Sequence, residues 1–178
     1  MAMKKTIGLP IILLLLSVSV QAGTDPNRWD GFRGLKWGTN IKDVNDPNMI
    51  LRESRDEVQI YMRSNDKLRI GDAQLVGIGY MFYKDRFFTV AIKAKGYTNF
   101  TALKDAVFAY YGQGKQLDEF KKEWTWLAAL GNSDKDVRME LSYNESSQET
   151  ILAMIYLPIF QEKNADDAKK AIGAGSNF

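Results

Sequence analysis

Over much of the chain, hydrophobic and polar residues alternate with a period of two, the pattern of half-buried β-strands. Residues 57–63 show this alternation first. Residues 72–96 then contain two longer runs separated by a polar turn at 84–86, which predicts a β-hairpin. Three later runs predict further strands at 123–130, 137–144 and 150–159.

The two faces of the 72–96 hairpin differ in character. One face is expected to pack on the core, and its members are Val76, Ile78, Tyr80, Phe82, Phe88, Val90 and Ile92. The opposite face carries Gly77 and Gly79, and glycine inside a strand is unfavourable unless something approaches the backbone closely. With Met81, Tyr83 and Ala91 beside them, these glycines predict a weakly polar patch for a partner protein, a second copy or the chain's own tail.

The period changes to a helical one after this hairpin. Phe100, Leu103 and Val107 share one helical face, and Gly112 lies where a helix commonly ends, so a helix is predicted over 98–111. A shorter helix is predicted over 39–44. The expected fold is therefore α+β, an antiparallel sheet of about six strands with two helices packed on one face.

The stretch Phe32–Val44, FRGLKWGTNIKDV, superficially suggests a phosphate-binding loop. Gly34 and Gly38 are spaced too closely for a P-loop, and no Lys-Ser or Lys-Thr pair follows them. The pattern instead indicates an extended segment that turns into a helix. We expect Trp37 to be buried, and Gly38 either to adopt a positive φ or to pack closely.

The ends of the chain differ from the region between them. Residues 1–22 combine Lys4 and Lys5 with an apolar run and a Val-x-Ala site, which predicts a cleaved signal peptide; the alternative is a retained anchor. Export predicts a periplasmic or secreted location. We expect a mobile lead-in at 23–31, one domain at 32–160 and a polar tail at 161–178 that can form a weak helix.

Composition excludes several kinds of chemistry. The chain has no histidine and no cysteine, which excludes Ser-His-Asp and Cys-His catalysis and most zinc, copper and iron sites. Loss of the signal peptide's two lysines leaves equal numbers of basic and acidic residues, so nucleic acid is not an expected partner. Asp134 and Asp136 only faintly resemble a calcium loop, and no metal or cofactor is predicted.

Two residue sets carry alternative functions. Trp124 and Trp126 share a face of one predicted strand and, with Tyr143, could line a pocket for a small ligand. A glycan hydrolase would need two facing carboxylates, and the candidates are Glu53, Glu57, Glu119 and Glu140.

Phe32–Val44, the hairpin YMFYKDRFFTVAIKAKG and the helix NFTALKDAVFAYYGQ together resemble a set of functionally uncharacterised exported bacterial proteins. Those proteins open with aromatic-x-Gly-x-x-Trp-Gly-Thr and carry a later helix that ends in Tyr-Gly. The segment Gly38–Val44 is more weakly similar to the helix openings of a small outer-membrane assembly lipoprotein and of β-lactamase-inhibitor-like domains. The resemblance implies a periplasmic α+β domain and supplies no catalytic residues.

The expected function is therefore a non-enzymatic exported domain that binds a protein or the cell envelope through a sheet face. The strand at 150–158 is apolar on both faces, which indicates that it is either central in the sheet or covered on both sides.

Overall fold

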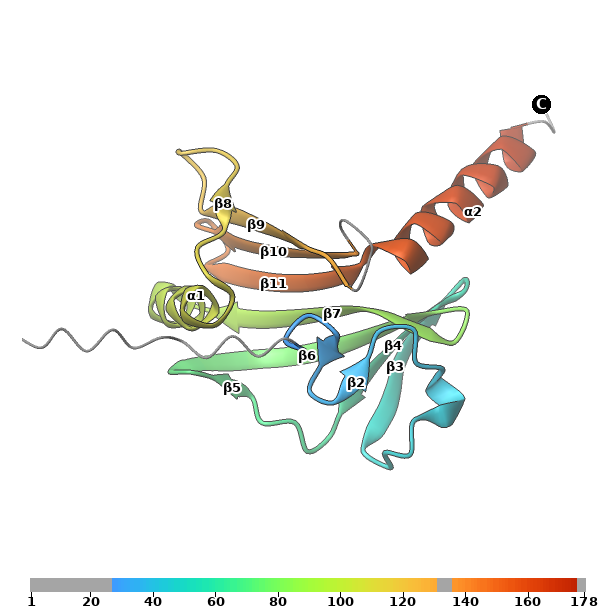
Figure 1. Cartoon of the computed structure of the whole chain (residues 1–178), viewed down its shortest axis with the longest axis horizontal. Helices are drawn as coiled ribbons and strands as arrows, with labels where there is room; N and C mark the ends of the chain where they lie inside the picture. The colour runs from blue at the N-terminus through green and yellow to red at the C-terminus, as the bar shows by residue number, and fades with distance from the viewer. Residues whose placement is uncertain (1–26, 131–135, 176–178) are drawn as a thin grey trace, which may run out of the picture.

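The computed structural model describes residues 27–130 and 136–175 (Figure 1). The predicted signal peptide at 1–22 lies outside the described residues. The strands are β1 (Gly31–Phe32), β2 (Leu35–Lys36), β3 (Met49–Arg55), β4 (Val58–Arg63), β5 (Arg69–Ile70), β6 (Ala73–Tyr83), β7 (Arg86–Lys95), β8 (Lys115–Gln116), β9 (Glu123–Ala128), β10 (Val137–Asn144) and β11 (Glu149–Tyr156). The helices are the 3₁₀ turn η1 (Ile41–Asp43), α1 (Tyr97–Tyr111) and α2 (Leu157–Gly175).

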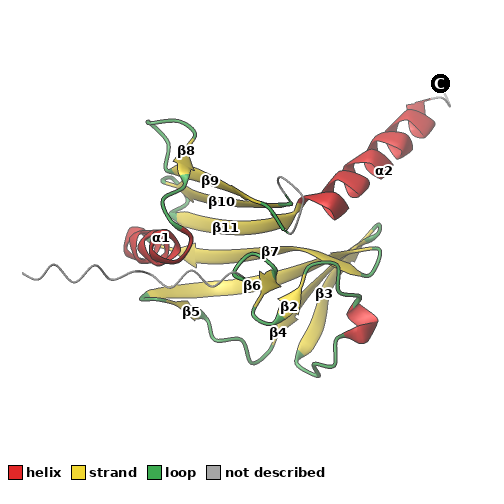
Figure 2. Ribbon diagram, viewed as in Figure 1, coloured by secondary structure: helices red, strands yellow, loops and turns green. Residues whose placement is uncertain are grey.

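The described residues form an α+β fold around a nine-stranded antiparallel sheet (Figure 2). The strand order is β3-β4-β6-β7-β11-β10-β9-β8, and β5 pairs with the start of β6. The predicted count of about six strands was too low. It missed β3, whose residues after Met49 are all exposed and show no alternation, and the two-residue strands β5 and β8, which are too short to carry a pattern.

Two β-bulges change which hairpin residues face the core. The pairing of β6 with β7 shifts register between Leu75 and Gly77, and Val76 is consequently exposed while Leu75 is buried. A second shift follows Met81, because Phe82 pairs with Phe87 whereas Met81 pairs with Thr89. Phe87 therefore takes the core position predicted for Phe88, and Phe88 packs on the opposite face.

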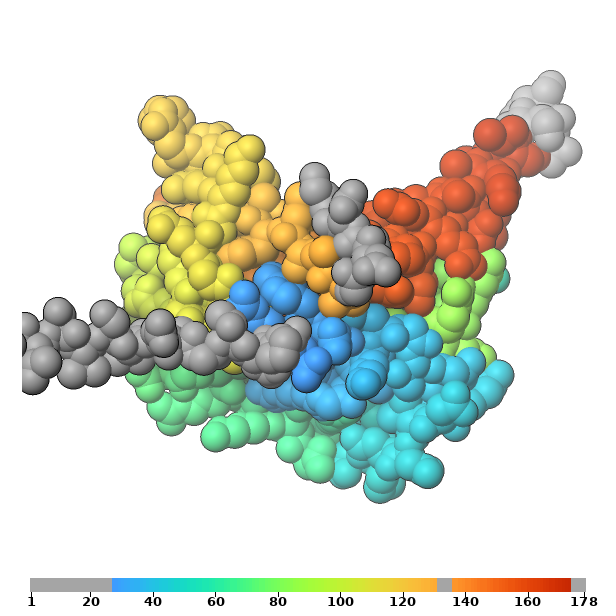
Figure 3. Space-filling view, viewed as in Figure 1, coloured from blue at the N-terminus to red at the C-terminus, as the bar shows by residue number. Residues whose placement is uncertain are grey.

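The main hydrophobic core lies between one face of the sheet and two covering segments. Phe100, Leu103 and Val107 of α1 pack on that face, as the helical pattern predicted. The N-terminal segment covers the rest of it, contributing Leu35 and the partly buried Trp37. Figure 3 shows this segment, in blue, lying against the visible side of the molecule.

Trp37 and Gly38 hold the N-terminal segment on the sheet. The Trp37 ring stacks on Phe87 with centroids 4.8 Å apart, and its indole N–H donates to the Trp29 carbonyl at 2.6 Å. Gly38 has a φ of 77°, as predicted, and its N–H donates to the Phe87 carbonyl at 2.8 Å. Trp29, in the predicted lead-in, also packs against Tyr111 of α1.

A buried carboxylate ties the β1–β2 hairpin to the sheet. Arg33 and Gly34 form the two-residue turn, and both have positive φ, 47° and 81°. The Arg33 guanidinium donates to Asp66 Oδ1 at 2.8 Å, and the Tyr80 hydroxyl donates to Asp66 Oδ2 at 2.9 Å. The Asp66 side chain is only 7% exposed, so this group joins three separate segments away from water.

The helices differ from the prediction at both ends of the domain. The expected helix at 39–44 is only the 3₁₀ turn η1, with Asn40 as its N-cap. The polar tail, which was predicted to be able to form a weak helix, is most of α2, and this helix begins at Leu157, before the expected boundary at residue 160. The two helices were predicted to pack on one face, but α1 covers the main core whereas Ile159 of α2 packs against Tyr83 and Phe88 on the opposite face. Within the described ranges, no helix is both long and apolar enough to span a membrane.

Candidate functional site

The face of the sheet opposite α1 carries a half-exposed apolar surface, which we call the open face. It extends over the five neighbouring strands β3, β4, β6, β7 and β11. Its residues are Ile50, Ile60, Met62, Gly77, Gly79, Met81, Ala91, Ile151 and Ala153. Ile50 is 38% exposed and Ile151 45%, so large apolar side chains on it contact solvent.

Small residues make the centre of the open face flat. Gly79 pairs with Ala91, and Ala91 pairs with Ala153, so three adjacent central strands present almost no side chain along one row. Larger neighbours lean over this row. A Cβ added at Gly79 would lie 3.5 Å from Ile60, and one at Gly77 would lie 3.2 Å from the Met62 methyl. The glycines therefore accommodate the β4 side chains and leave a shallow surface.

Charged side chains lie within the open face at one point and border it elsewhere. Lys93 separates Gly77 from Ile151 in the strand register and pairs with Glu149 at 2.5 Å. On β10, Arg138 and Glu140 form an ion pair at 3.0 Å. An apolar centre with a charged rim is the usual anatomy of a protein–protein interface.

The first turns of α2 cover one end of this same face. Ile159 packs on Tyr83 and Phe88, and the Arg138 guanidinium lies 5.5 Å from the centre of the Phe160 ring. Tyr83 was predicted to belong to the exposed patch, but it is 1% exposed because α2 lies over it. The other patch residues, Gly77, Gly79, Met81 and Ala91, are partly exposed.

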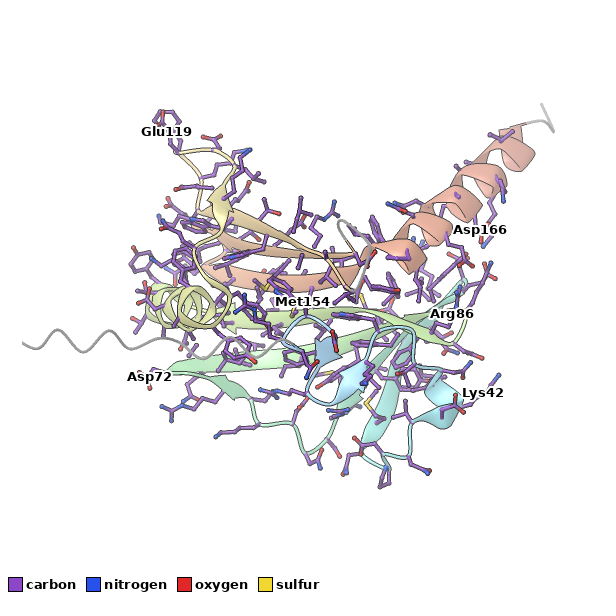
Figure 4. The ribbon with its side chains drawn as sticks, in the orientation of Figure 1. Lys42, Asp72, Arg86, Glu119, Met154 and Asp166 are labelled. Carbon is purple, nitrogen blue, oxygen red and sulfur yellow. The ribbon has the colours of Figure 1, made fainter. Side chains whose placement is uncertain are left out.

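A cluster of charges fixes α2 to the turns at this end of the sheet. The Tyr83 hydroxyl lies 2.9 Å from Asp166 Oδ2 and 3.3 Å from Glu57 Oε2. It has one proton, so the shorter contact is the better donated bond. Lys84 contacts Asp166 at 2.6 Å and Lys170 contacts Glu57 at 2.9 Å, and Figure 4 shows Asp166 on the side of the molecule where Arg86 lies.

The cluster changes the ionisation of its members. Hydrogen bonds from Lys84 and then Tyr83 lower the pKa of Asp166 to about 2. The Lys170 ammonium lowers the pKa of Glu57, and Arg86 lowers that of Glu162. Burial, helped by the bond to Asp166, raises the pKa of Tyr83 to about 12. At neutral pH the carboxylates are thus charged and the phenol is neutral, which is the state that the hydrogen bonds require.

The three aromatic residues that were predicted to line a ligand pocket, Trp124, Trp126 and Tyr143, lie beneath α1. Phe100 stacks on Tyr143 with centroids 4.7 Å apart, and Phe108 packs edge-on against Trp124 and Trp126. The Trp126 indole N–H donates to the Gly112 carbonyl at 2.9 Å. The space between helix and sheet that was expected to hold a ligand therefore contains side chains of α1.

The four predicted glutamates lie apart in the fold. Glu53 is exposed on β3, Glu57 forms an ion pair with Lys170 of α2, and Glu140 forms an ion pair with Arg138 beside the open face. Glu119 lies on the β8–β9 loop, which Figure 4 shows far from Asp166. Among the residues in 27–130 and 136–175, no group of three acidic side chains is arranged to hold a metal ion. Asp134, of the faint calcium motif, lies outside the described residues.

Several open-face residues were not identified from the sequence. Ile60 and Met62 were placed on a strand, but the sequence does not say which strand neighbours it. Gly77 and Gly79 indicated that something lies close to this strand, and the structure shows that a β4 side chain lies over each glycine. No local pattern in the sequence indicates the α2 cluster, since the α2 residues and their partners are separated by 76 residues or more along the chain.

Comparisons with protein-family models, with curated proteins and with solved structures find no match to this chain.

Proposed function

We propose that this chain is an exported, non-enzymatic domain that binds a partner protein through its open face. The observation that carries the proposal is the apolar surface over five strands, from Ile50 on β3 to Ile151 on β11, which α2 covers at one end only. Monomeric proteins seldom expose contiguous apolar surfaces unless they bind something. The charged rim around Ala91 fits a protein partner with an apolar contact surface.

The electrostatics support a binding role rather than hydrolysis. A glycosidase needs one carboxylic acid whose pKa is raised so that it can donate a proton. Glu57 and Asp166 share Tyr83 as a neighbour, but their lysine partners lower both pKa values.

Site-specific photocrosslinking in the native periplasm tests the open face directly. A photoreactive amino acid at Met81 or Ala91 should give a discrete covalent adduct, because both side chains are partly exposed on this face. The same group at Thr101 of α1 serves as the matched control on the other side of the sheet. Equal adducts at all three positions, or none at Met81 and Ala91, would count against the proposal.

A charge placed on the face gives a second test. Ala91→Glu and Gly79→Glu should abolish the Met81 adduct while far-ultraviolet circular dichroism remains unchanged, since both positions border solvent. Gln74→Glu is the control, because Gln74 is exposed on the same strand as Gly79 but lies at the start of that strand, where it pairs with β5. Retention of the adduct in both face variants would place the partner elsewhere.

Export is tested separately. The full chain should appear in the periplasmic fraction with Gly23 as its new N-terminus, because the Val-x-Ala pattern ends at Ala22. An intact N-terminus in the membrane fraction would instead indicate a retained anchor.

A further inference from the structure

A small apolar cavity lies on the other side of the sheet from the open face, where α1 meets the N-terminal hairpin. Its volume is about 170 Å³. The inner wall consists of apolar side chains from three elements, namely Ile70 of β5, Ala106 and Val107 of α1, and Leu152 and Met154 of β11. Met154 lies near the middle of the molecule (Figure 4).

The cavity exists because two separate segments cover the core. The hairpin and α1 each pack on the sheet, and small residues lie where they meet. A Cβ added at Gly71 would lie 2.9 Å from the Ala106 Cβ, so the contact beside the cavity consists of a glycine and an alanine. Protein interiors rarely leave voids much larger than a water molecule. An apolar cavity of about 150 Å³ stays dry and can hold a benzene ring.

A wider hollow of about 450 Å³ lies beside the cavity at the surface. Phe32, Arg33, Tyr110 and Tyr111 line both spaces, so the cavity and the hollow are adjacent.

The outer hollow has an excess of positive charge. Its charged lining residues are Arg28, Asp30, Arg33 and Lys36. The charge of Arg33 is balanced by Asp66, which leaves two cations against the single carboxylate of Asp30. A ligand with an anionic group would be favoured here over a cationic one.

We propose that this site binds a small amphipathic anion, with an aromatic ring or short alkyl chain in the cavity and a carboxylate in the outer hollow near Arg28 and Lys36. The two parts of the site select the two parts of such a ligand. Leu152 and Met154 face the main core, so the site does not depend on the open face or on a protein partner.

Titration of the mature chain with benzoate, benzylamine and toluene tests the proposal by NMR of ¹³C-labelled methyl groups. Benzoate should shift the methyl signals of Ala106, Leu152 and Met154 and leave that of Met81, on the open face, unchanged. Benzylamine should bind at least about tenfold more weakly than benzoate, because the ring is the same and the charge is reversed. Equal affinities would overturn the anionic assignment, and shifts confined to Met81 would overturn the site.

Substitutions test the contributions of the cavity and of the outer hollow to binding separately. Ala106→Leu should lower benzoate and toluene affinity at least about tenfold by filling the cavity. Ala109→Leu, exposed on the same helix, should leave both affinities unchanged. Ile70→Phe fills the cavity from the opposite wall and replaces Ala106→Leu if that variant fails to fold. The double variant Arg28→Gln/Lys36→Gln should weaken benzoate by about two- to tenfold and leave toluene unchanged.

Absence of binding by all three probes at millimolar concentration would refute the site. So would unchanged affinity in both cavity-filling variants. Neither result would bear on the photocrosslinking of the open face.

Discussion

Asp66→Asn is expected to destabilise the fold by detaching the β1–β2 hairpin from the sheet. Asn keeps one oxygen that can accept from Tyr80, but it removes the negative charge opposite Arg33. Breaking a buried ion pair by removing one partner costs about 3–5 kcal/mol. The Arg33 side chain is 25% exposed and can recover some hydration, so we expect a loss of about 2–3 kcal/mol in the free energy of unfolding.

Urea denaturation followed by tryptophan fluorescence measures this loss, since Trp29 and Trp37 flank the hairpin. For a domain of this size the same change lowers the melting temperature by about 5–10 °C. Asp72→Asn is the matched control, because Asp72 pairs with Arg69 while its side chain is 92% exposed. That change should alter stability by no more than about 0.5 kcal/mol.

A double-mutant cycle with Arg33→Met isolates the pair itself. If the Arg33–Asp66 contact carries the effect, the double variant should be more stable than the two single losses predict, with a coupling of about 1–2 kcal/mol. An Asp66→Asn variant no less stable than Asp72→Asn, or a coupling of zero, would show that the hairpin is held by its apolar contacts alone.

Three further changes test other parts of the structure. Asp166, Glu57 and Glu162 have lowered pKa values in the folded protein, so their stabilisation of α2 is complete above their ordinary pKa values and is lost as the pH falls through the folded ones, about 2 for Asp166. The Ile159 methyl signal should report this release of α2, and Asp166→Asn should remove much of the pH dependence. Gly114→Ala should cost about 1–3 kcal/mol in thermal unfolding, because its Cβ would lie 2.5 Å from the Trp126 ring, and an unperturbed Trp126 fluorescence would contradict this packing. Gly173→Ala should instead stabilise α2 by about 0.5–1 kcal/mol, because the added Cβ would meet no neighbouring side chain or segment within 4 Å. Faster hydrogen exchange of the α2 amides in this variant would contradict the expectation.

The main elements could be predicted from the sequence where local patterns decide them. The 72–96 hairpin, the helix with Phe100 and Leu103, and the positive φ of Gly38 all rest on short-range periodicity or backbone sterics, and the structure has them. The bulges at Val76 and Phe88 could not be predicted, because an extra residue in one strand is set by pairing with the next. Val76 and Phe88 were therefore assigned to the wrong face.

The α2 helix shows a different limit. The last strand was predicted to continue to residue 159, but β11 ends at Tyr156 and residues 157–159 begin α2. Pro158 is well tolerated there, because in the first turn of a helix its missing N–H has no partner to lose. The polar tail has no strong apolar stripe, so its docking depends on Ile159 and on charges that reach Glu57 and Lys84 elsewhere in the chain. Of the candidate site, the hairpin residues Gly77, Gly79, Met81 and Ala91 could be predicted from the sequence, whereas the contributions of β3, β4 and β11 depend on strand pairing that no local pattern reveals.

The two outermost strands of the sheet limit how the protein can associate with others. β3 exposes Arg52, Glu53 and Arg55, and β8 at the other side is only two residues long and includes Lys115. Charged or very short edge strands are poor templates for adding a strand from another molecule. The charges on β3 and the shortness of β8 therefore disfavour edge-to-edge polymerisation of the sheet, which agrees with the proposal that a partner binds the broad surface rather than a margin.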